Sequence, residues 1–236
     1  MKIAVIPARF GSKRIKKKNI KIFFSKPMIV WVIEKLKKSN FFDKIVVSSD
    51  SDDILNVVKK TKCIFVIKRP KSLSGDHIGV QPVIKHAISK IKKNNSNFQY
   101  ICCIYPCNPF LDIEDLKKSF KRFKNNKDKF LFSIAEYSHP IQRAIKLKKD
   151  FSTSSYFRGS FNKRTQDLKK SYYDAGQFCW GTIKLWEGKK NIHNFGVGFE
   201  VPFWRVVDID TLHDWKRAEL LFKILNIKSF KIKKHG

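Results

Sequence analysis

A short cationic stretch near the N-terminus has the residue types that bind phosphate. Residues 2–7 (KIAVIP) are apolar and mostly β-branched, which predicts a buried strand, and the strand runs into residues 8–19, where glycine, serine, arginine and lysine alternate. Gly11 would let the backbone approach an anion, while Arg9 and Lys13 would supply positive charge. The spacing is neither that of a Walker loop nor that of a dinucleotide-binding fingerprint. The stretch is a candidate phosphate cradle, the alternative being an edge loop in a lysine-rich protein.

Two carboxylates near the C-terminus are a candidate cation site. Asp208 and Asp210 end the apolar run 199–207, which predicts a strand. Residues i and i+2 of a strand point to the same face, so both carboxylates could converge on one hard cation such as Mg²⁺. The alternative is capping of a following helix over residues 211–225, with Asp210 or Thr211 as the cap.

Alternating strand and helix patterns predict what positions these residues. Strands are expected at residues 2–7, 45–48, 63–68, 100–105 and 130–135, and helices at 28–38, 53–60, 80–91 and 113–123. This order is typical of an α/β fold with a mostly parallel sheet and helices on both faces. Ligands bind beyond the carboxyl ends of such strands, so the cationic loop, Arg69 and Pro106 should surround one crevice. A further strand is expected at 177–183.

Residues 136–175 interrupt the pattern. They are polar and lack periodic apolar positions, yet they contain too many aromatic residues to predict disorder, among them Tyr156, Phe157, Phe161, Tyr172 and Tyr173. We expect an inserted segment within one domain that spans residues 1–236, a length sufficient for a real core.

Composition excludes several classes of function. The net charge of +30 suggests nucleic-acid binding, but the lysines are spread over nearly every segment and no nucleic-acid-binding motif is present. We therefore expect no specific nucleic-acid partner, although the charge could attract anionic substrates. No apolar run is long enough to span a membrane. The five cysteines are odd in number and lack C-x-x-C spacing, which predicts a reducing cytoplasm rather than disulfides or zinc.

The cationic loop resembles the opening motif of the sugar cytidylyltransferases, which make CMP-activated acid sugars. The resemblance rests on Ile6-Pro7-Ala8-Arg9, Gly11-Ser12-Lys13 and Lys18-Asn19. It implies a Rossmann-like, three-layer nucleotidyltransferase fold related to the GT-A fold. It also implies that the loop wraps the triphosphate of CTP through Ala8, Arg9, Gly11, Ser12, Lys13, Lys18 and Asn19.

Other stretches match the same family. The resemblance implies that Asp208 and Asp210 hold Mg²⁺ and that Arg69, Ser74 and Asp76 lie against the nucleotide. Residues 105–109 (YPCNP) resemble the family's Gln-Pro-Thr-Ser-Pro turn, which faces nucleotide and sugar, with Tyr105 in place of glutamine. In the family, the segment that corresponds to residues 136–175 is an arm that exchanges with a second subunit, so a homodimer is expected.

The arm motifs distinguish branches of the family. The combination of Arg-Thr-Gln-Asp-Leu (164–168) with Tyr-x-Asp-Ala-Gly-Gln-Phe (172–178) resembles the enzymes that activate pseudaminic acid, a nine-carbon keto acid with two acylamino groups. Sialic acid enzymes have Tyr-Arg-Pro-Asn-Gly at the second motif, where this chain has Tyr173 instead of arginine. The implied sugar contacts, with Arg164 near the carboxylate, are Tyr105, Asn108, Arg164, Gln166, Tyr173, Asp174 and Gln177.

The resemblance implies attack of the sugar's anomeric hydroxyl on the α-phosphate of CTP, with release of pyrophosphate. Arg9, Lys13 and Asp208 are the expected catalytic residues, and a metal-bound water or hydroxide is the expected base. Sialic, legionaminic and 3-deoxy-manno-octulosonic acid remain alternative sugars. A basic nucleic-acid-binding protein on an inactive scaffold is the alternative from another class.

Overall fold

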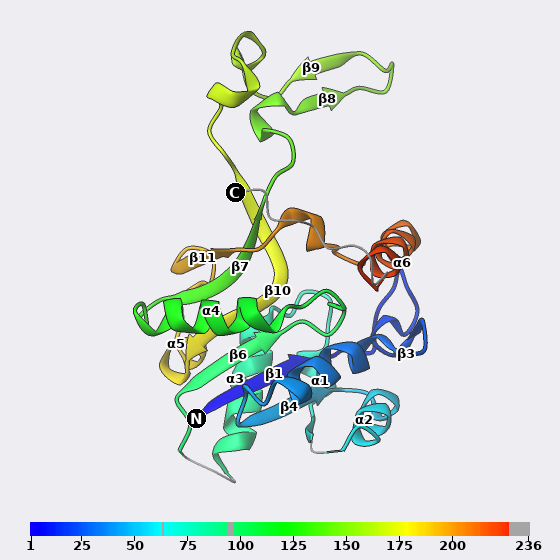
Figure 1. Ribbon diagram of the computed structural model, residues 1–236, viewed down its shortest axis with the longest axis vertical. Helices are drawn as coiled ribbons and strands as arrows, with labels where there is room; N and C mark the ends of the chain where they lie inside the picture. The colour runs from blue at the N-terminus through cyan, green and yellow to red at the C-terminus, as the bar shows by residue number, and fades with distance from the viewer. Residues whose placement is uncertain (63, 94–96, 227–236) are drawn as a thin grey trace.

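A seven-stranded sheet forms the centre of the structure, a computed structural model that describes residues 1–62, 64–93 and 97–226. The strand order is β11-β7-β10-β6-β1-β4-β5 (Figure 1). The strands are β1 (Lys2–Pro7), β4 (Lys44–Ser49), β5 (Phe65–Lys68), β6 (Tyr100–Ile104), β7 (Phe130–Glu136), β10 (Tyr172–Thr182) and β11 (Gly196–Glu200). Only β10 runs antiparallel to its neighbours in this sheet. The predicted α/β fold with a mostly parallel sheet is confirmed.

Helices cover both faces of the sheet because each has an apolar stripe that must be buried. Helices α1 (Met28–Ser39), α2 (Asp52–Lys59) and α4 (Ile113–Lys124) cover one face. Helices α3 (Val80–Lys92) and α5 (Ile183–Glu187) cover the other. Helix α6 (Leu212–Asn226) buries Trp215 and Ala218 in a third cluster, together with Phe23, beside the small hairpin of β2 (Ile22–Phe23) and β3 (Lys26–Pro27).

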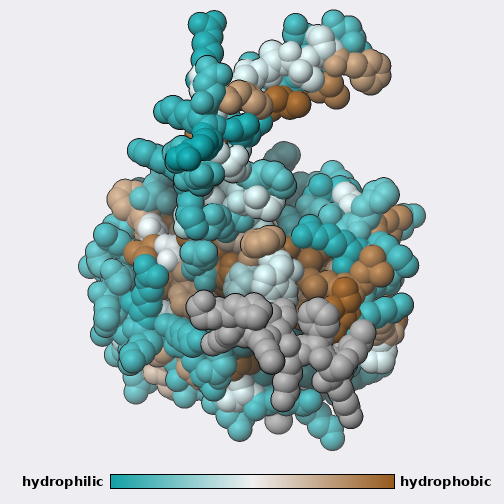
Figure 2. Space-filling model, turned by 45° about the horizontal axis from the view of Figure 1, so that its top comes forward, coloured by the Kyte–Doolittle hydropathy of each residue, from teal (hydrophilic) through white to brown (hydrophobic). Residues whose placement is uncertain are grey.

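The predicted insertion is an arm that leaves the body of the molecule between β7 and β10 (Figure 1). It carries a hairpin of β8 (Ile145–Leu147) and β9 (Thr153–Ser155) and stands clear of the body in the space-filling view (Figure 2). Every residue of the hairpin strands is exposed. The arm ends where β10 begins, at Tyr172, which is earlier than the predicted boundary at 175.

One predicted strand is wrong. Residues 199–207 do not form a single strand, since β11 ends at Glu200 and a 3₁₀ turn follows at Phe203–Arg205. Pro202 lacks the backbone N–H that would continue the ladder, and Val201 makes the last pairing, to the Ile134 carbonyl at 2.8 Å. Asp208 and Asp210 therefore lie on an irregular segment.

Among the described residues, no helix is both long and apolar enough to cross a membrane. Cys102, Cys103, Cys107 and Cys179 are free. Cys63, with which a strand was predicted to begin, lies outside the described residues.

Candidate active site

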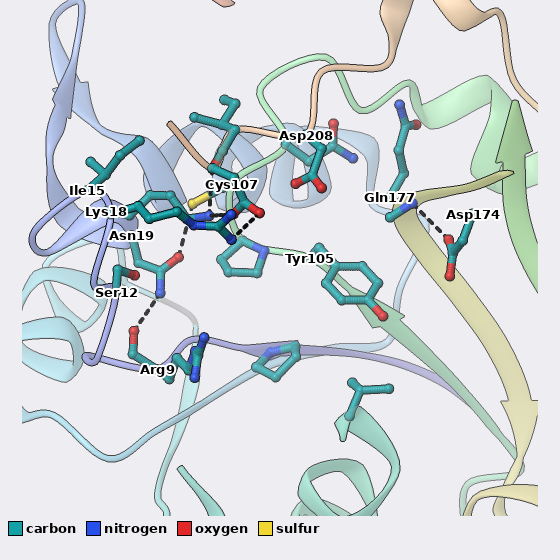
Figure 3. Close-up of a pocket in the computed structure, with 18 of the residues that line it drawn as sticks. Arg9, Ser12, Ile15, Lys18, Asn19, Tyr105, Cys107, Asp174, Gln177 and Asp208 are labelled. Atoms are coloured by element: carbon teal, nitrogen blue, oxygen red, sulfur yellow. Dashed lines mark hydrogen bonds and ion pairs between the residues drawn. The ribbon is translucent and has the colours of Figure 1, made fainter. Parts of the chain in front are cut away.

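A large open cleft lies at the carboxyl ends of β1, β5 and β6, where the α/β fold predicts ligand binding. Its volume is about 1110 Å³. It gathers residues from the cationic loop, the segment before α3, the turn after β6, the start of β10 and the segment before α6 (Figure 3). Of the predicted site residues, the following line it: Arg9, Ser12, Lys13, Lys18, Asn19, Arg69, Ser74, Asp76, Tyr105, Asn108, Tyr173, Asp174, Gln177, Asp208 and Asp210.

The cationic loop is pinned to the body by hydrogen bonds along its backbone. The Ala8 N–H donates to the Ser48 carbonyl at 2.9 Å, and the Phe10 N–H donates to Asp50 Oδ1 at 3.1 Å. The buried Asn19 amide donates to the Arg9 carbonyl at 2.7 Å. Ala8 itself is fully buried and lies outside the cleft lining, so it anchors the loop instead of facing a ligand.

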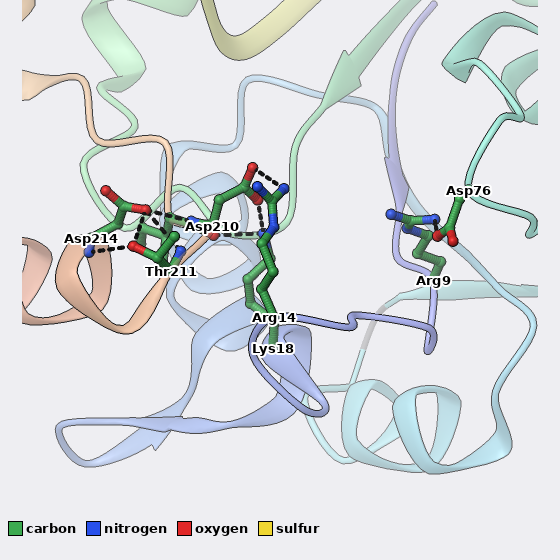
Figure 4. A network of polar contacts seen from close by, with 8 residues as sticks. Arg9, Arg14, Lys18, Asp76, Asp210, Thr211 and Asp214 are labelled. Atoms are coloured by element: carbon green, nitrogen blue, oxygen red, sulfur yellow. Dashed lines mark hydrogen bonds and ion pairs between the residues drawn. The ribbon is translucent and has the colours of Figure 1, made fainter. Parts of the chain in front are cut away.

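The loop directs cationic side chains toward the cleft, whereas Gly11, predicted to contact the nucleotide, is not among the cleft residues. No heavy atom outside the immediate chain lies within 4 Å of where a Cβ of Gly11 would stand. Arg9 Nη1 and Lys13 Nζ each lie 2.6 Å from a different carboxylate oxygen of Asp76 (Figure 4 shows the Arg9 pair). Hydrogen bonds from Lys13 and Arg9 hold the pKa of Asp76 below its usual range. Asp76, which was expected to lie against the nucleotide, thus pairs with the two cations that are expected to bind phosphate.

The predicted carboxylate pair points into the cleft although no strand precedes it. Ile209 is buried in the cluster under α6, and this places Asp208 and Asp210 on the cleft side of the segment. Both oxygens of Asp210 are engaged, Oδ2 by Arg14 Nη2 at 2.5 Å and Oδ1 by Lys18 Nζ at 3.0 Å (Figure 4). Lys18 also donates to the Ile209 carbonyl at 2.6 Å. These contacts hold the segment against the cationic loop.

Helix α6 is capped by Thr211, which is one of the two predicted candidates, together with Asp214. The Thr211 hydroxyl accepts the Asp214 N–H at 3.2 Å, and Asp214 Oδ2 accepts the Thr211 N–H at 2.8 Å. Because Thr211 provides the cap, neither Asp208 nor the side chain of Asp210 is needed for it.

The chemistry of the donors fits a hard divalent cation that is completed by phosphate oxygens. The described residues contain no group of three or more His, Cys, Asp or Glu side chains that could hold a metal. Two carboxylates are nevertheless what Mg²⁺ uses beside a nucleotide. Burial and the neighbouring Asp210 raise the pKa of Asp208, and no hydrogen bond or ion pair joins its carboxylate to the described part of the chain. Asp208 is thus the carboxylate that is free to bind a cation.

The side of the cleft near α3 offers unused hydrogen-bonding groups. Arg69 is 4% exposed, lies 3.6 Å from Asp50, and has its pKa lowered by burial. Arg69 Nε and the Ser74 hydroxyl have no hydrogen-bond partner in the described part of the molecule. Buried polar groups are rarely left unpaired, so these atoms are candidates to bind a polar ligand.

A bulge in β10 shapes the side of the cleft that lies away from α3. The β7–β10 register shifts between Asp174 and Cys179, and Gly176 adopts φ +58°, which favours glycine. The buried Ser133 hydroxyl accepts the N–H groups of Gln177 and Phe178 at 3.0 and 3.3 Å. The bulge leaves Gln177 Oε1 without a hydrogen-bond partner among the described residues.

The turn after β6 lies beside the bulge (Figure 3). Burial raises the pKa of Tyr105, whose N–H donates to the Gln177 carbonyl at 3.1 Å. Asn108 is 6% exposed, and its Nδ2 lacks a partner within the described ranges. Tyr105 and Asn108 thus both line the cleft, and their contact with a sugar stays a prediction.

Two predicted sugar contacts lie outside the cleft that this chain builds. Arg164 and Gln166 are on the arm, and the Arg164 guanidinium pairs with Asp167 at 3.0 Å. The arm leads away from the body, so in this chain neither residue reaches the cleft (Figure 1). Contact with the cleft of a second chain remains a prediction.

The cleft is also lined by charged or titratable residues that were not among the predicted site residues: Arg14, Cys107, His193, Asp214 and Arg217. Arg14 lies within the predicted cationic loop of residues 8–19, so its position in sequence was a usable signal. His193 and Arg217 come from a loop and a helix with no motif, and nothing in their spacing indicates the cleft.

Comparisons with known proteins agree with this geometry. A protein-family model described as cytidylyltransferase matches residues 3–181. The chain is 37% identical over 229 residues to a pseudaminic acid cytidylyltransferase of Campylobacter jejuni subsp. jejuni serotype O:2, which covers 97% of this chain and 99% of that protein. It is 28% identical over 175 residues to an N-acylneuraminate cytidylyltransferase of Escherichia coli O18:K1:H7, covering 74% and 40% of the two chains.

A solved structure of CMP:2-keto-3-deoxy-manno-octonic acid synthetase complexed with CTP has a TM-score of 0.70, with 14% identity, 94% of this chain and 98% of that chain covered. This likeness shows the shared fold. The family match over residues 3–181 and the 37% identity over nearly the whole chain show that the chain belongs to the cytidylyltransferase family.

Proposed function

We propose that this protein transfers the CMP group of CTP to pseudaminic acid, giving CMP-pseudaminic acid and pyrophosphate. The observation that carries the proposal is one cleft in which a cationic loop, a carboxylate pair and the β10 bulge face each other. The 37% identity to a pseudaminic acid cytidylyltransferase over nearly the whole chain supports the choice of sugar.

The reaction divides between two sides of the cleft. Arg9, Ser12 and Lys13 bind the triphosphate and stabilise the charge that develops as pyrophosphate leaves. The sugar lies near Tyr105, Asn108 and Gln177, so that its anomeric oxygen faces the α-phosphorus. A bond forms between that oxygen and phosphorus, the bond from phosphorus to the oxygen bridging to the β-phosphate breaks, and the hydroxyl proton passes to a water or hydroxide in the cleft. Arg69 and Ser74 bind the cytosine and ribose.

Mg²⁺ is part of the proposal, with Asp208 and Asp210 as the residues that would hold it. When bound, it would neutralise phosphate charge and lower the pKa of a coordinated water. Because Asp210 is paired with Arg14 and Lys18, its binding to a cation requires Arg14 to move away, whereas Asp208 needs no such exchange.

Dimerisation through the arm and a cytoplasmic location are also proposed. Exposed apolar side chains on the arm support a second chain as partner, since large exposed hydrophobic patches mark interaction sites. The four cysteines among the described residues are free, which supports a reducing compartment.

Pyrophosphate release tests the proposal. The protein is incubated with CTP and Mg²⁺ and with either pseudaminic acid or N-acetylneuraminic acid. We expect release with pseudaminic acid and little with the sialic acid. Release only with the sialic acid would refute the proposed sugar and leave the chemistry standing.

A further inference from the structure

His193 stands in the cleft beside Asp174 and has no part in the proposed chemistry. Its Nε2 lies 2.9 Å from Asp174 Oδ2, and both residues line the cleft. The ring meets Phe132 of β7 edge to face, with centroids 5.2 Å apart. Its side chain is 59% exposed, so a ligand in the cleft could reach it.

The loop that carries His193 is built to hold it in place. Asn191 Oδ1 accepts the N–H groups of His193 and Asn194 at 2.9 and 3.2 Å. The Phe195 N–H donates to the Asn191 carbonyl at 3.0 Å, and the Phe195 carbonyl accepts the first N–H of β7, from Phe130, at 3.0 Å. His193 is thus held at its backbone N–H, by the ring contact with Phe132 and at Nε2.

Both carboxylate oxygens of Asp174 are engaged by groups of the protein itself. Its Oδ1 accepts the Gly176 N–H at 2.8 Å, and its Oδ2 faces His193. A carboxylate can only accept, so Nε2 is the donor of this bond. In the neutral ring Nδ1 is then an acceptor, and Asp174 selects that tautomer.

The pair lies on the sugar side of the cleft. In Figure 3 Asp174 is at the β10 end, opposite Arg9 and Ser12, and Gln177 stands between Asp174 and Asp208. Gln177 thus separates Asp174 from the carboxylate that would hold a cation beside the α-phosphate. This placement suits a substituent of the sugar that is remote from the anomeric carbon.

We propose that His193 is a specificity-determining residue whose imidazole accepts a hydrogen bond from an N–H or O–H substituent of the acid sugar. Asp174 is the positioning residue that orients the ring. This inference rests on the proposed function, since it names what recognises the sugar in that reaction.

The test compares Michaelis constants for the two substrates. In His193→Ala and in Asp174→Ala, we expect the KM for the sugar to rise about three- to tenfold, the loss of one hydrogen bond. The KM for CTP and the kcat should stay near those of the unaltered enzyme. Because both changes remove the same interaction with the sugar, the double variant should differ little from either single variant. In His193→Gln, the glutamine side chain can donate a hydrogen bond to Asp174. This variant should therefore recover part of the affinity for the sugar that His193→Ala loses.

A matched control is His213→Ala, since this exposed histidine of α6 is not among the cleft residues. It should leave both KM values unchanged. If the unaltered enzyme turns over the sugar while both single variants keep its KM, the inference fails and the proposed function stands. A fall in kcat at constant KM would also overturn it, because the pair would then act on the reacting atoms. Absence of pyrophosphate release by the unaltered enzyme with every nine-carbon acid would refute the proposed function and this inference together.

Discussion

Asp208 is the single residue on which the proposed metal chemistry depends most. Replacing it in Asp208→Asn keeps the shape but removes the charge that would bind Mg²⁺ beside the α-phosphate. We expect kcat to fall at least about 100-fold, the scale on which loss of one transition-state contact acts. Pyrophosphate release measured over a range of Mg²⁺ concentrations checks this.

The matched control is Asp128→Asn, an exposed carboxylate outside the cleft. It should retain full activity. Near-normal turnover of Asp208→Asn at saturating Mg²⁺ would show that the metal is held elsewhere.

Asp76 presents an unusual case, an anion at the mouth of a site for an anionic substrate. It holds Arg9 and Lys13 at 2.6 Å each, and both cations must exchange it for phosphate when CTP binds. We expect Asp76→Asn to lower the KM for CTP about two- to tenfold, because exposed ion pairs are individually weak. The effect should shrink as salt is added.

Asp53→Asn is the control for this prediction. Asp53 pairs with Lys17 at 3.0 Å, next to the same loop but outside the cleft lining. Its substitution should leave the KM for CTP unchanged. A rise in that KM in Asp76→Asn would instead make Asp76 a direct nucleotide ligand, as the sequence predicted.

At the scale of elements, the bulge in β10 depends on one buried hydroxyl. In Ser133→Ala the N–H groups of Gln177 and Phe178 lose their acceptor, which should cost about 1–3 kcal/mol of unfolding free energy. For a chain of this size we expect the melting temperature to fall by several degrees, at about 2–4 °C per kcal/mol. The KM for the sugar should also rise, because Gln177 is no longer held. Thermal unfolding and steady-state kinetics measure both effects.

Ser119→Ala separates stability from binding. Ser119 is equally buried and accepts the Trp180 indole N–H at 3.0 Å, but it lies on α4 away from the cleft. It should lower the melting temperature while the KM for the sugar stays constant. An equal change of that KM in both variants would mean that the bulge has no special part in binding.

The elements with strong periodicity could be predicted from sequence, and those shaped by tertiary contacts could not. The predicted strand at 2–7 and helix at 28–38 correspond to β1 and α1 almost residue for residue. An apolar run carries no signal for strand direction, so the antiparallel orientation of β10 was not predicted. Its first residues, from Tyr172, are half exposed and bulged, which hid the strand within the arm.

The candidate site was predictable at the ends of the strands. The loop after β1 and Arg69 after β5 do line one cleft, because the loops at the carboxyl ends of parallel strands all lie along the same edge of the sheet. His193 is brought to Asp174 by an aperiodic loop, and only the folded chain shows that contact. The pairing of Asp210 with Arg14 is likewise a long-range contact without a sequence signal.

At the scale of the whole molecule, the arm is the feature that a single chain leaves unexplained. Its apolar side chains include Leu147 at 67% and Phe151 at 82% exposure, values at which neither contributes to the core. Figure 2 shows apolar surface on the arm, apart from the body. The arm motif also carries Arg164 and Gln166, which cannot serve the cleft of their own chain without a large movement.

A dimer in which each arm lies on the other subunit would account for both facts. We expect the unaltered protein to be a dimer by light scattering after size-exclusion chromatography, and Leu147→Ser/Phe151→Ser to dissociate into monomers, since apolar burial drives such association. Leu220→Ser, at a position on α6 that is 53% exposed, should remain dimeric. If the partner's arm completes the cleft, the monomeric variant should also show a raised KM for the sugar at an unchanged KM for CTP. A monomeric unaltered protein with full activity would exclude the exchanged arm and leave Arg164 without a role in the site.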